Sequence, residues 1–382
     1  MTHQMRLVAG ALAFAISMAF APTPASAKGP APISAADIAS LVSVHTAQPV
    51  TMSIYATGLL NPRGLKFGPD GNLYVAEGGS GGNDSTTPLQ CTQVPSAGPY
   101  TGSPTGGRIS RIDRFHVRTT VTDGFPSSQT NPGLGSLVSG VADVAFIGNN
   151  LYAITAGSGC SHGVIGTYNE VALVSPDGSI HPIANLSAYQ MSHPVQNPEP
   201  EDFEPDGTWY SMIALRGDLY AVEPNHGELV RIRLNGAVSR VADISASQGH
   251  IVPTALAYHG NFYVGNLHTF PIVDGSSKIL KITPSGQVRT VATGLTTVLG
   301  LAFDRHDRMY VLQNTTGYLF PTPGAGSVVR IDPSGLQQTI ITGLVLPTGM
   351  TFGPDGALYI SNVGLGFPPI GLGQVLRFDL GN

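Results

Sequence analysis

Residues 64–75 read Gly-Leu-Lys-Phe-Gly-Pro-Asp-Gly-Asn-Leu-Tyr-Val, and residues 349–360 repeat the pattern as Gly-Met-Thr-Phe-Gly-Pro-Asp-Gly-Ala-Leu-Tyr-Ile. In each copy the proline presets the negative φ of a tight turn, the aspartate bonds its own backbone, and the glycine accepts the positive φ that follows. Short apolar steps lie on both sides of the turn. Each copy therefore predicts a β-hairpin whose second strand is centred on a tyrosine.

A tyrosine-centred apolar step of this kind occurs six times. The six tyrosines are Tyr74, Tyr152, Tyr220, Tyr263, Tyr310 and Tyr359. The last three intervals match the roughly 40–50 residues of one propeller blade, and the first two are lengthened by insertions. A second type of turn, such as Thr-Pro-Ser-Gly at 283–286, joins a third strand to a fourth. We therefore predict an all-β fold, a six-bladed β-propeller of four-stranded blades.

The sixth unit lacks room for its fourth strand, because only residues 379–382 follow its third strand at 374–378. The N-terminal segment 51–59 reads Thr-Met-Ser-Ile-Tyr-Ala-Thr-Gly-Leu, and the fourth-strand segments of two other units also end in Thr-Gly-Leu, at 293–295 and 342–344. We therefore expect the N-terminal strand to complete the last blade. This arrangement closes the ring and leaves no open radial edge.

The first 27 residues have the features of a secretory signal peptide. A short basic start up to Arg6 precedes the apolar residues 7–21 and the small-x-small site Ala25-Ser26-Ala27. The apolar stretch is shorter than the roughly 20 residues that a membrane-spanning helix needs. We therefore expect cleavage near Ala27, a tether over residues 28–50 and a propeller domain over residues 51–382. The mature protein is expected to be secreted or periplasmic, without a membrane span.

The composition limits the partners of the protein. Only 11% of the 382 residues are charged, and the formal net charge is −5. A weakly acidic protein without a basic run lacks the electrostatic footprint of nucleic-acid binding. We therefore expect no nucleic-acid partner. We expect a monomer that binds a small molecule, a glycan or a protein.

The two long intervals contain the two cysteines of the chain. Cys91 lies in residues 78–107 of the first unit, and Cys160 lies in residues 156–168 of the second, at the equivalent place. Two cysteines in equivalent loops of adjacent blades of an exported chain favour a disulfide. The alternative is two thiols that stay free or bind a metal.

The repeat pattern resembles the NHL-type six-bladed propellers. Residues 62–65 (Pro-Arg-Gly-Leu), 252–257 (Val-Pro-Thr-Ala-Leu-Ala) and 262–265 (Phe-Tyr-Val-Gly), together with the closing unit, more narrowly resemble the ScyD/ScyE family of secreted bacterial propellers. This resemblance implies a fold and export, but no activity. Residues 207–211 and 222–227 depart from the family's third-blade pattern, so we expect any shared central pocket to be altered.

A polar residue stands three positions beyond each repeat tyrosine. Because blades are related by rotation about one axis, these side chains are expected to converge around one mouth of the channel. Carboxylate and amide oxygens are the ligands that calcium prefers. We therefore predict a calcium site, with Ca²⁺ as the only cofactor expected. Its candidate ligands are Glu77, Glu223, Asn266, Asn362 and Asn314, which is adjacent to the equivalent residue Gln313. Alternatively, these residues end their strands by bonding neighbouring backbone.

Local catalytic motifs are weak. Residues 78–82 satisfy Gly-x-Ser-x-Gly, but the hydrolase elbow needs a following helix, and this segment enters a loop. Two further groups lie in or near loops. The segment 193–206, with His193, Glu199, Glu201, Asp202 and Glu204, could bind a cation, cover the channel mouth or be solvated. One of the scattered histidines could act as a general base: His162, His226, His250 and His268.

Three classes of function follow from these features. We expect an exported propeller that binds a ligand or partner through the loops on one face, since the scaffold is present without a catalytic signature. A second class is a calcium-dependent lactonase or lyase, because gluconolactonase-type propellers use a comparable axial metal to polarise a substrate carbonyl. A third class is a structural or accessory protein of the envelope. Whether the chain is an enzyme stays open at this point.

Overall fold

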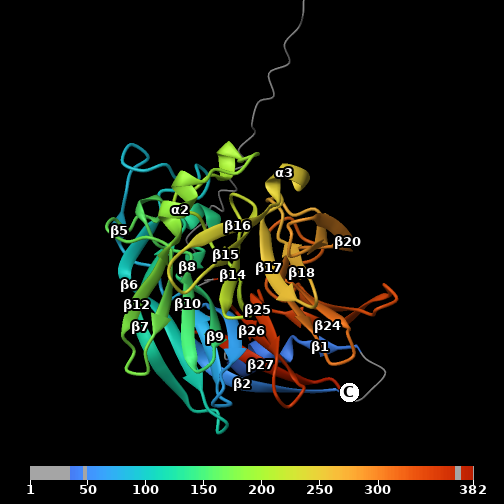
Figure 1. Cartoon of the computed structure of the whole chain (residues 1–382). Helices are drawn as coiled ribbons and strands as arrows, with labels where there is room; N and C mark the ends of the chain where they lie inside the picture. Colours follow the sequence, from blue (N-terminus) through green and yellow to red (C-terminus); the bar gives the residue numbers. More distant parts are fainter. Residues whose placement is uncertain (1–34, 46–49, 366–370, 382) are drawn as a thin grey trace, which may run out of the picture. The chain divides into compact units, whose positions relative to one another are not determined.

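The structure, a computed structural model, describes residues 35–45, 50–365 and 371–381 (Figure 1). The predicted signal peptide and part of the predicted tether fall in residues 1–34 and 46–49, which lie outside the described residues. No helix of the described residues is long and apolar enough to cross a membrane.

Six sheets of antiparallel strands form the six predicted blades. Blade 1 contains β3 (Pro62–Phe67), β4 (Leu73–Glu77), β6 (Thr101–Ile112) and β7 (Arg118–Gln129). Blade 2 contains β9 (Val141–Ile147), β10 (Asn150–Thr155), β11 (Glu170–Val174) and β12 (Ile180–Asn185). Blade 3 contains β13 (Met212–Leu215), β14 (Asp218–Glu223), β15 (Glu228–Ile232) and β16 (Val238–Asp243). Blade 4 contains β17 (Pro253–Tyr258), β18 (Phe262–Asn266), β19 (Ser277–Ile282) and β20 (Val288–Leu295). Blade 5 contains β21 (Val298–Phe303), β22 (Met309–Gln313), β23 (Gly326–Ile331) and β24 (Gln337–Leu344). Blade 6 contains β25 (Gly349–Phe352), β26 (Leu358–Asn362), β27 (Gly373–Asp379) and β2 (Thr51–Leu59).

The N-terminal strand completes the last blade, as the sequence predicts. Strand β2 pairs antiparallel with β27, with Ser53 opposite Arg377 and Leu59 opposite Gly373. The first strands of successive blades contact one another in the order β3, β9, β13, β17, β21 and β25, and β25 contacts β3 again. The ring is therefore closed by pairing the two ends of the domain.

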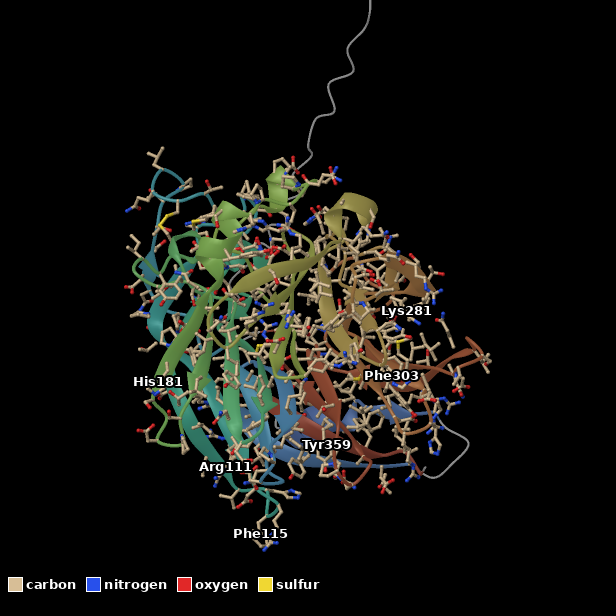
Figure 2. All side chains as sticks on the ribbon, in the orientation of Figure 1. Arg111, Phe115, His181, Lys281, Phe303 and Tyr359 are labelled. Atoms are coloured by element: carbon tan, nitrogen blue, oxygen red, sulfur yellow. A yellow bond between two sulfur atoms is a disulfide. The ribbon has the colours of Figure 1, made fainter. Side chains whose placement is uncertain are left out.

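The repeat tyrosine joins each blade to its neighbour, and this explains its recurrence. The Tyr359 ring meets the Phe67 ring of blade 1 edge-on, with centroids 4.9 Å apart, and the Tyr359 hydroxyl donates to Asp355 in the preceding turn at 3.0 Å. Tyr74 makes the same pair of contacts, with Phe146 of blade 2 and with Asp70. Tyr359 lies far from the loops that carry α2 (Leu186–Ser192) and α3 (Ser245–Gln248) (Figures 1 and 2).

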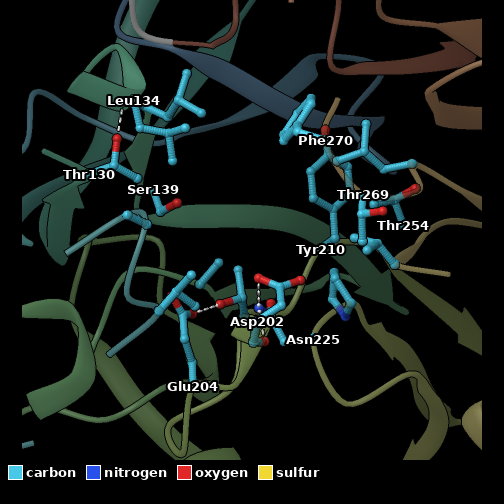
Figure 3. Close-up of a pocket in the computed structure, with 18 of the residues that line it drawn as sticks. Thr130, Leu134, Ser139, Asp202, Glu204, Tyr210, Asn225, Thr254, Thr269 and Phe270 are labelled. Atoms are coloured by element: carbon cyan, nitrogen blue, oxygen red, sulfur yellow. Dashed lines mark hydrogen bonds between the residues drawn. The ribbon is translucent and has the colours of Figure 1, made fainter. Parts of the chain in front are cut away.

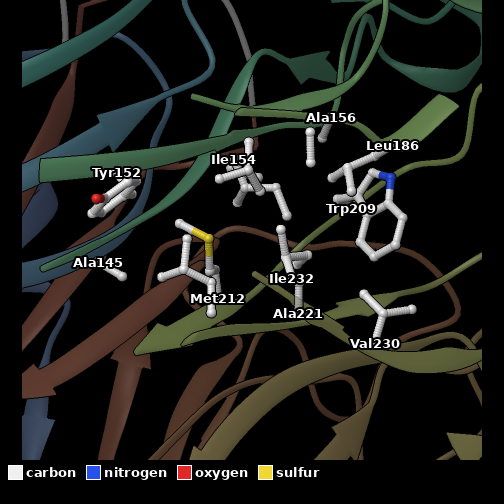
Figure 4. Packing of buried hydrophobic residues seen from close by; sticks show 14 of the residues in the cluster. Ala145, Tyr152, Ile154, Ala156, Leu186, Trp209, Met212, Ala221, Val230 and Ile232 are labelled. Carbon is white, nitrogen blue, oxygen red and sulfur yellow. The ribbon is translucent and has the colours of Figure 1, made fainter. Parts of the chain in front are cut away.

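The core lies between the blades. Six hydrophobic clusters each combine buried residues of two neighbouring blades. In the cluster between blades 2 and 3, Ile154 packs with Met212 and Trp209, and Leu186 of α2 closes it (Figure 4). The segment that carries α2 is thus anchored to the hydrophobic core.

Two short elements precede the ring. The helix α1 (Ala35–Ser40) buries Ile38 and Ala39, and β1 (Ser43–Val44) adds to the outer edge of β24 in blade 5. Ala39 belongs to the cluster between blades 5 and 6. This part of the predicted tether therefore packs against the propeller and covers an edge strand.

The two insertions are joined by the predicted disulfide between Cys91 and Cys160, whose Cα atoms are 5.8 Å apart. The Thr86 hydroxyl also donates to the carbonyl of Cys160 at 2.7 Å. Cys160 begins the 3₁₀ turn η2 (Cys160–His162). The loops of blades 1 and 2 therefore form one covalently linked wall on the face that carries α2 and α3.

Candidate functional site

A cavity of about 820 Å³ opens at one end of the ring. Its lining includes at least one residue from every blade: Arg63, Val141, Tyr210, Thr254, Leu299 and Leu365. These residues lie where first strands begin or where second strands have ended, so the cavity lies at one mouth of the central channel. The insertions at 78–100 and 193–206 supply further lining residues.

A buried ion pair forms one wall. His162 Nε2 and Glu204 Oε2 are 3.0 Å apart, and both side chains are almost fully buried. The hydroxyls of Tyr100 and Thr208 also donate to the Glu204 carboxylate, and His162 Nδ1 bonds the carbonyl of Ser158 at 2.9 Å. The pair therefore joins the insertions of blades 1 and 2 to the segment 193–206.

The two members of this pair shift each other's titration. Burial alone would raise the pKa of Glu204, but the ion pair with His162 and the hydrogen bonds from Thr208 and Tyr100 together outweigh burial and lower this pKa below its usual value. Burial alone would lower the pKa of His162, but the carboxylates of Glu204 and Asp206 raise it above its usual value. Both shifts favour a charged pair near neutral pH.

A second histidine–carboxylate pair lies nearer the opening. His250 Nε2 and Asp202 Oδ2 are 2.7 Å apart, and the Asp202 side chain is 32% exposed. The Asn225 amide donates to Asp202 Oδ1 at 3.0 Å and to the carbonyl of Asp202 at 2.8 Å. Burial raises the pKa of Asp202, and the contacts with His250 oppose that rise. Asp202, Glu204 and Asn225 lie together on one side of the cavity (Figure 3).

The other sides of the cavity are aromatic and aliphatic. Phe270 and Tyr210 face the polar side in Figure 3, and Leu134 lies on a third side. The Tyr210 hydroxyl donates to the carbonyl of Thr348 at 2.9 Å, and burial raises its pKa to about 12. Arg63 lies with its guanidinium carbon 6.0 Å from the Tyr210 ring centroid and donates to the carbonyl of Val138. The Tyr210 hydroxyl and the Arg63 guanidinium are thus both hydrogen-bonded to backbone carbonyls of the protein.

The structure places the predicted ring residues at the last position of the second strands, except Asn314, which follows that position. Each is buried, and only Asn314 among the five predicted ligands lines the cavity. The other four bond their own blade. Glu77 pairs with Arg108 at 2.5 Å and accepts from Leu60 N, and Glu223 accepts from Thr208 N at 2.7 Å.

The side-chain amides of Asn266 and Asn362 also form hydrogen bonds with nearby backbone. The Asn266 amide donates to the carbonyl of Ile251 at 2.9 Å, and Asn362 Oδ1 accepts from Val345 N at 2.8 Å. Within the described ranges, no three His, Cys, Asp or Glu side chains are grouped to hold a metal ion. Calcium binding by the ring stays a prediction of the sequence.

The structure instead brings together the scattered histidines and the acidic segment. His162, His250 and His268 line the cavity with four of the five acids of residues 193–206, whereas His193 and Asp206 do not. His226 lies behind the cavity wall, where its Nε2 bonds the carbonyl of Glu204 at 2.9 Å. Sequence reasoning missed Tyr100 and Thr208, because neither lies in a repeat motif. The third-blade segments 207–211 and 222–227 both contribute lining residues.

Comparison with known proteins supports the fold. Residues 189–382 match a family described as a repeat of unknown function (DUF6923). No curated protein matches the sequence of the chain.

Three solved structures with a similar fold carry the names of enzymes. A putative oxidoreductase (glucose dehydrogenase) of Thermus thermophilus is 16% identical, with a TM-score of 0.55 over 87% of this chain and 100% of that chain. The PQQ-bound aldose sugar dehydrogenase of Streptomyces coelicolor is 13% identical, with a TM-score of 0.52 over 87% and 98%. A putative gluconolactonase is 11% identical, with a TM-score of 0.51 over 88% and 93%. At these identities the likeness shows the fold alone.

Proposed function

The chain belongs to the DUF6923 repeat family, and we propose that it is an exported β-propeller that binds a small organic ligand in the cavity at the mouth of its ring. The observation that carries this proposal is the cavity itself, about 820 Å³ and lined from all six blades. Ligand pockets of proteins have volumes of roughly 300–1,000 Å³ and combine apolar walls with a few convergent polar groups. This cavity has both features.

The bonds that hold the walls of the cavity in place favour ligand binding. The disulfide, the His162–Glu204 pair and the Tyr210–Thr348 hydrogen bond hold three sides of the cavity in place. A cavity whose walls are fixed before the ligand arrives loses little conformational entropy on binding. The aliphatic and aromatic side chains supply the apolar contact area, and the histidine–carboxylate pairs supply orientation.

Export is part of the proposal. A disulfide between surface loops persists in oxidising compartments and is rare in the cytosol. We assign residues 1–27 to a cleaved signal peptide, residues 28–50 to the segment before the ring and residues 51–382 to the propeller domain. The resemblance to the ScyD/ScyE family agrees with export and adds no ligand. Mass spectrometry of the N-terminus of the mature protein tests the cleavage site.

Binding in the cavity is tested with a neutral apolar fluorescent probe, N-phenylnaphthylamine, and one substitution that enlarges a side chain of the cavity wall. Leu134 lies on η1 (Pro132–Leu134) at the cavity wall, and Leu234 is an exposed turn residue outside the cavity. We expect saturable binding of the probe, weakened at least fivefold by Leu134→Trp and unchanged by Leu234→Trp. Equal binding by both variants would overturn the proposal, and so would a natural protein that binds neither this probe nor any of the benzyl compounds described below.

The predicted calcium site is tested separately by metal content. Stoichiometric calcium that is lost in the double variant Glu77→Gln/Glu223→Gln would support a metal at the ring. Protein that stays metal-free after equilibration with calcium would count against the metal and against the lactonase or lyase function that depends on it.

A further inference from the structure

Acidic side chains dominate the charge of the cavity. Its described lining residues contain four carboxylates and, among lysines and arginines, only Arg63. The carboxylates are Glu199, Glu201, Asp202 and Glu204. Four carboxylates stand against one arginine and the two histidines that pair with Glu204 and Asp202, so a ligand in the cavity meets an excess of negative charge.

The compensation inside the protein does not remove this excess. Glu204 is paired with His162, and Arg63 is held by the carbonyl of Val138 beside the Tyr210 ring. Of the remaining three carboxylates, only Asp202 takes part in an ion pair among the described residues, and its partner is His250. Glu199 and Glu201 have no such partner there. The charge beside η3 (Pro200–Asp202) is thus left for the solvent or for a ligand.

Aromatic rings form the wall opposite these carboxylates. The rings of Phe270 and Phe320 lie 6.4 Å apart at an angle of 27°, and the two side chains are 37% and 56% exposed. Tyr210 lines the cavity as well. The faces of such rings attract organic cations, by about 0.5–2 kcal/mol for each contact depending on desolvation. An aromatic wall also favours an organic ligand over a hydrated inorganic ion.

We propose that the ligand of this cavity is an organic cation, an amine or quaternary ammonium compound that carries an apolar or aromatic group. Its positive charge lies beside Asp202 and the neighbouring glutamates, and its apolar group lies against Phe270, Phe320 and Leu134. The cavity disfavours carboxylates, sulfonates and phosphates, because an anion there would meet uncompensated carboxylates across a partly desolvated gap. This inference rests on the proposed function and specifies its ligand class.

Three probes of one shape test the charge. Benzyltrimethylammonium is cationic, benzyl methyl sulfone is neutral, and phenylmethanesulfonate is anionic. Their dissociation constants are measured by calorimetry and by displacement of N-phenylnaphthylamine. We expect the cation to bind at least tenfold more tightly than the sulfone, and the sulfonate to bind most weakly. Raising the salt concentration is expected to weaken the binding of the cation and to leave that of the sulfone unchanged.

Matched variants locate the charge. Asp202→Asn, and independently Glu199→Gln/Glu201→Gln, are each expected to reduce the preference for the cation over the sulfone at least threefold without weakening the binding of the sulfone. The control Asp123→Asn removes an exposed carboxylate of β7 outside the cavity and should change nothing. The double glutamate variant keeps the test valid if Asp202→Asn disturbs the Asn225 contacts.

The outcomes separate the two proposals. If the neutral probe binds in the cavity but the three benzyl compounds bind equally, or the sulfonate binds best, the cation inference is wrong and ligand binding stands. If neither the neutral probe nor any benzyl compound binds, both proposals are wrong. If the cation binds but neither acidic variant changes its preference, the placement beside η3 is wrong and the inference fails.

Discussion

His162 and Glu204 form a buried ion pair, with Nε2 and Oε2 3.0 Å apart, although one belongs to the blade-2 insertion and the other to the segment between blades 2 and 3. Thr208 and Tyr100 complete the bonding of the Glu204 carboxylate. This pair fixes the wall of the cavity, so its charge state controls how firmly the wall is held.

The stability contributed by this pair should depend on pH. The pKa of His162 is raised from 6.5, so its contribution is full below pH 6.5 and is lost as the pH rises through the folded value. The pKa of Glu204 is lowered from 4.5, so its contribution is full above pH 4.5 and is lost as the pH falls through the folded value. The pair therefore contributes most between about pH 4.5 and 6.5.

The variant His162→Gln tests this dependence. We expect it to lower the free energy of unfolding by about 3 kcal/mol near pH 5.5, since breaking a buried pair leaves an uncompensated charge. The loss should shrink as the pH rises through the raised pKa of His162 in the folded protein, because the natural histidine then becomes neutral as well. Urea denaturation over a series of pH values from 5.5 upward measures the change, and a loss that stays constant across the series would contradict the charged pair.

Removal of the disulfide should loosen the wall and lower stability together. The bond between Cys91 and Cys160 spans 69 residues and contributes about 4 kcal/mol in the chain-entropy model. We expect Cys91→Ser/Cys160→Ser to lower the melting temperature and to weaken binding of N-phenylnaphthylamine, because Cys160 begins the turn that holds His162. Reduction of the natural protein should reproduce both effects. Unchanged probe binding would show that the cavity does not depend on the disulfide.

The closure of the ring through β2 and β27 makes the two N-terminal segments unequal. A chain that begins at residue 60 lacks β2 and leaves the edge of β27 open, so we expect it to lose cooperative unfolding. A chain that begins at residue 50 lacks only α1 and β1 of the described elements and should still unfold cooperatively. Thermal denaturation followed by circular dichroism compares the two chains. Equal melting temperatures would contradict closure by β2.

The hydrogen bond and the aromatic contact of the repeat tyrosine should contribute separately to stability. Tyr359→Phe keeps the edge-on contact with Phe67 but loses the hydrogen bond to Asp355, so we expect a loss of about 1 kcal/mol in the free energy of unfolding. Tyr359→Leu loses the aromatic contact as well and should cost about 1 kcal/mol more. Chemical denaturation measures both changes. A larger effect of Tyr359→Phe than of Tyr359→Leu would contradict this division.

The fold could be predicted because the contacts that build it recur in the sequence. Tyr359 with Asp355 and Phe67, and Tyr74 with Asp70 and Phe146, make the same contacts at fixed spacings, so each copy supports the others. Ring closure followed from one missing strand and one spare segment. The disulfide followed from two cysteines at equivalent places.

The cavity could be predicted only in fragments. Its polar wall joins Tyr100, His162 and Glu204, which lie in three insertions that have no counterpart in the other blades. Repeat equivalence carries no information about such insertions, so their mutual contacts cannot be deduced from spacing. The sequence marked the acidic segment and the histidines separately, and only the folded chain places them around one space.

For the polar residues after the repeat tyrosines, the repeat predicted their shared position but not their role. Their equivalence is real, since Glu77, Glu223 and Asn362 all accept a hydrogen bond from the backbone that leads into the first strand of their blade. A polar side chain at the buried end of a strand must satisfy its bonds, and nearby backbone supplies the partners. Position in the repeat alone therefore could not distinguish this role from metal binding.

The central claim, that the cavity binds an organic cation, is tested most directly by the anomalous scattering of a bromine-labelled ligand in a crystal. Crystals soaked with para-bromobenzyltrimethylammonium should show a bromine peak inside the cavity, near Phe270 and Leu134, with the ammonium group beside Asp202. A bromine peak confined to another surface, with no ligand density in the cavity, would contradict the claim.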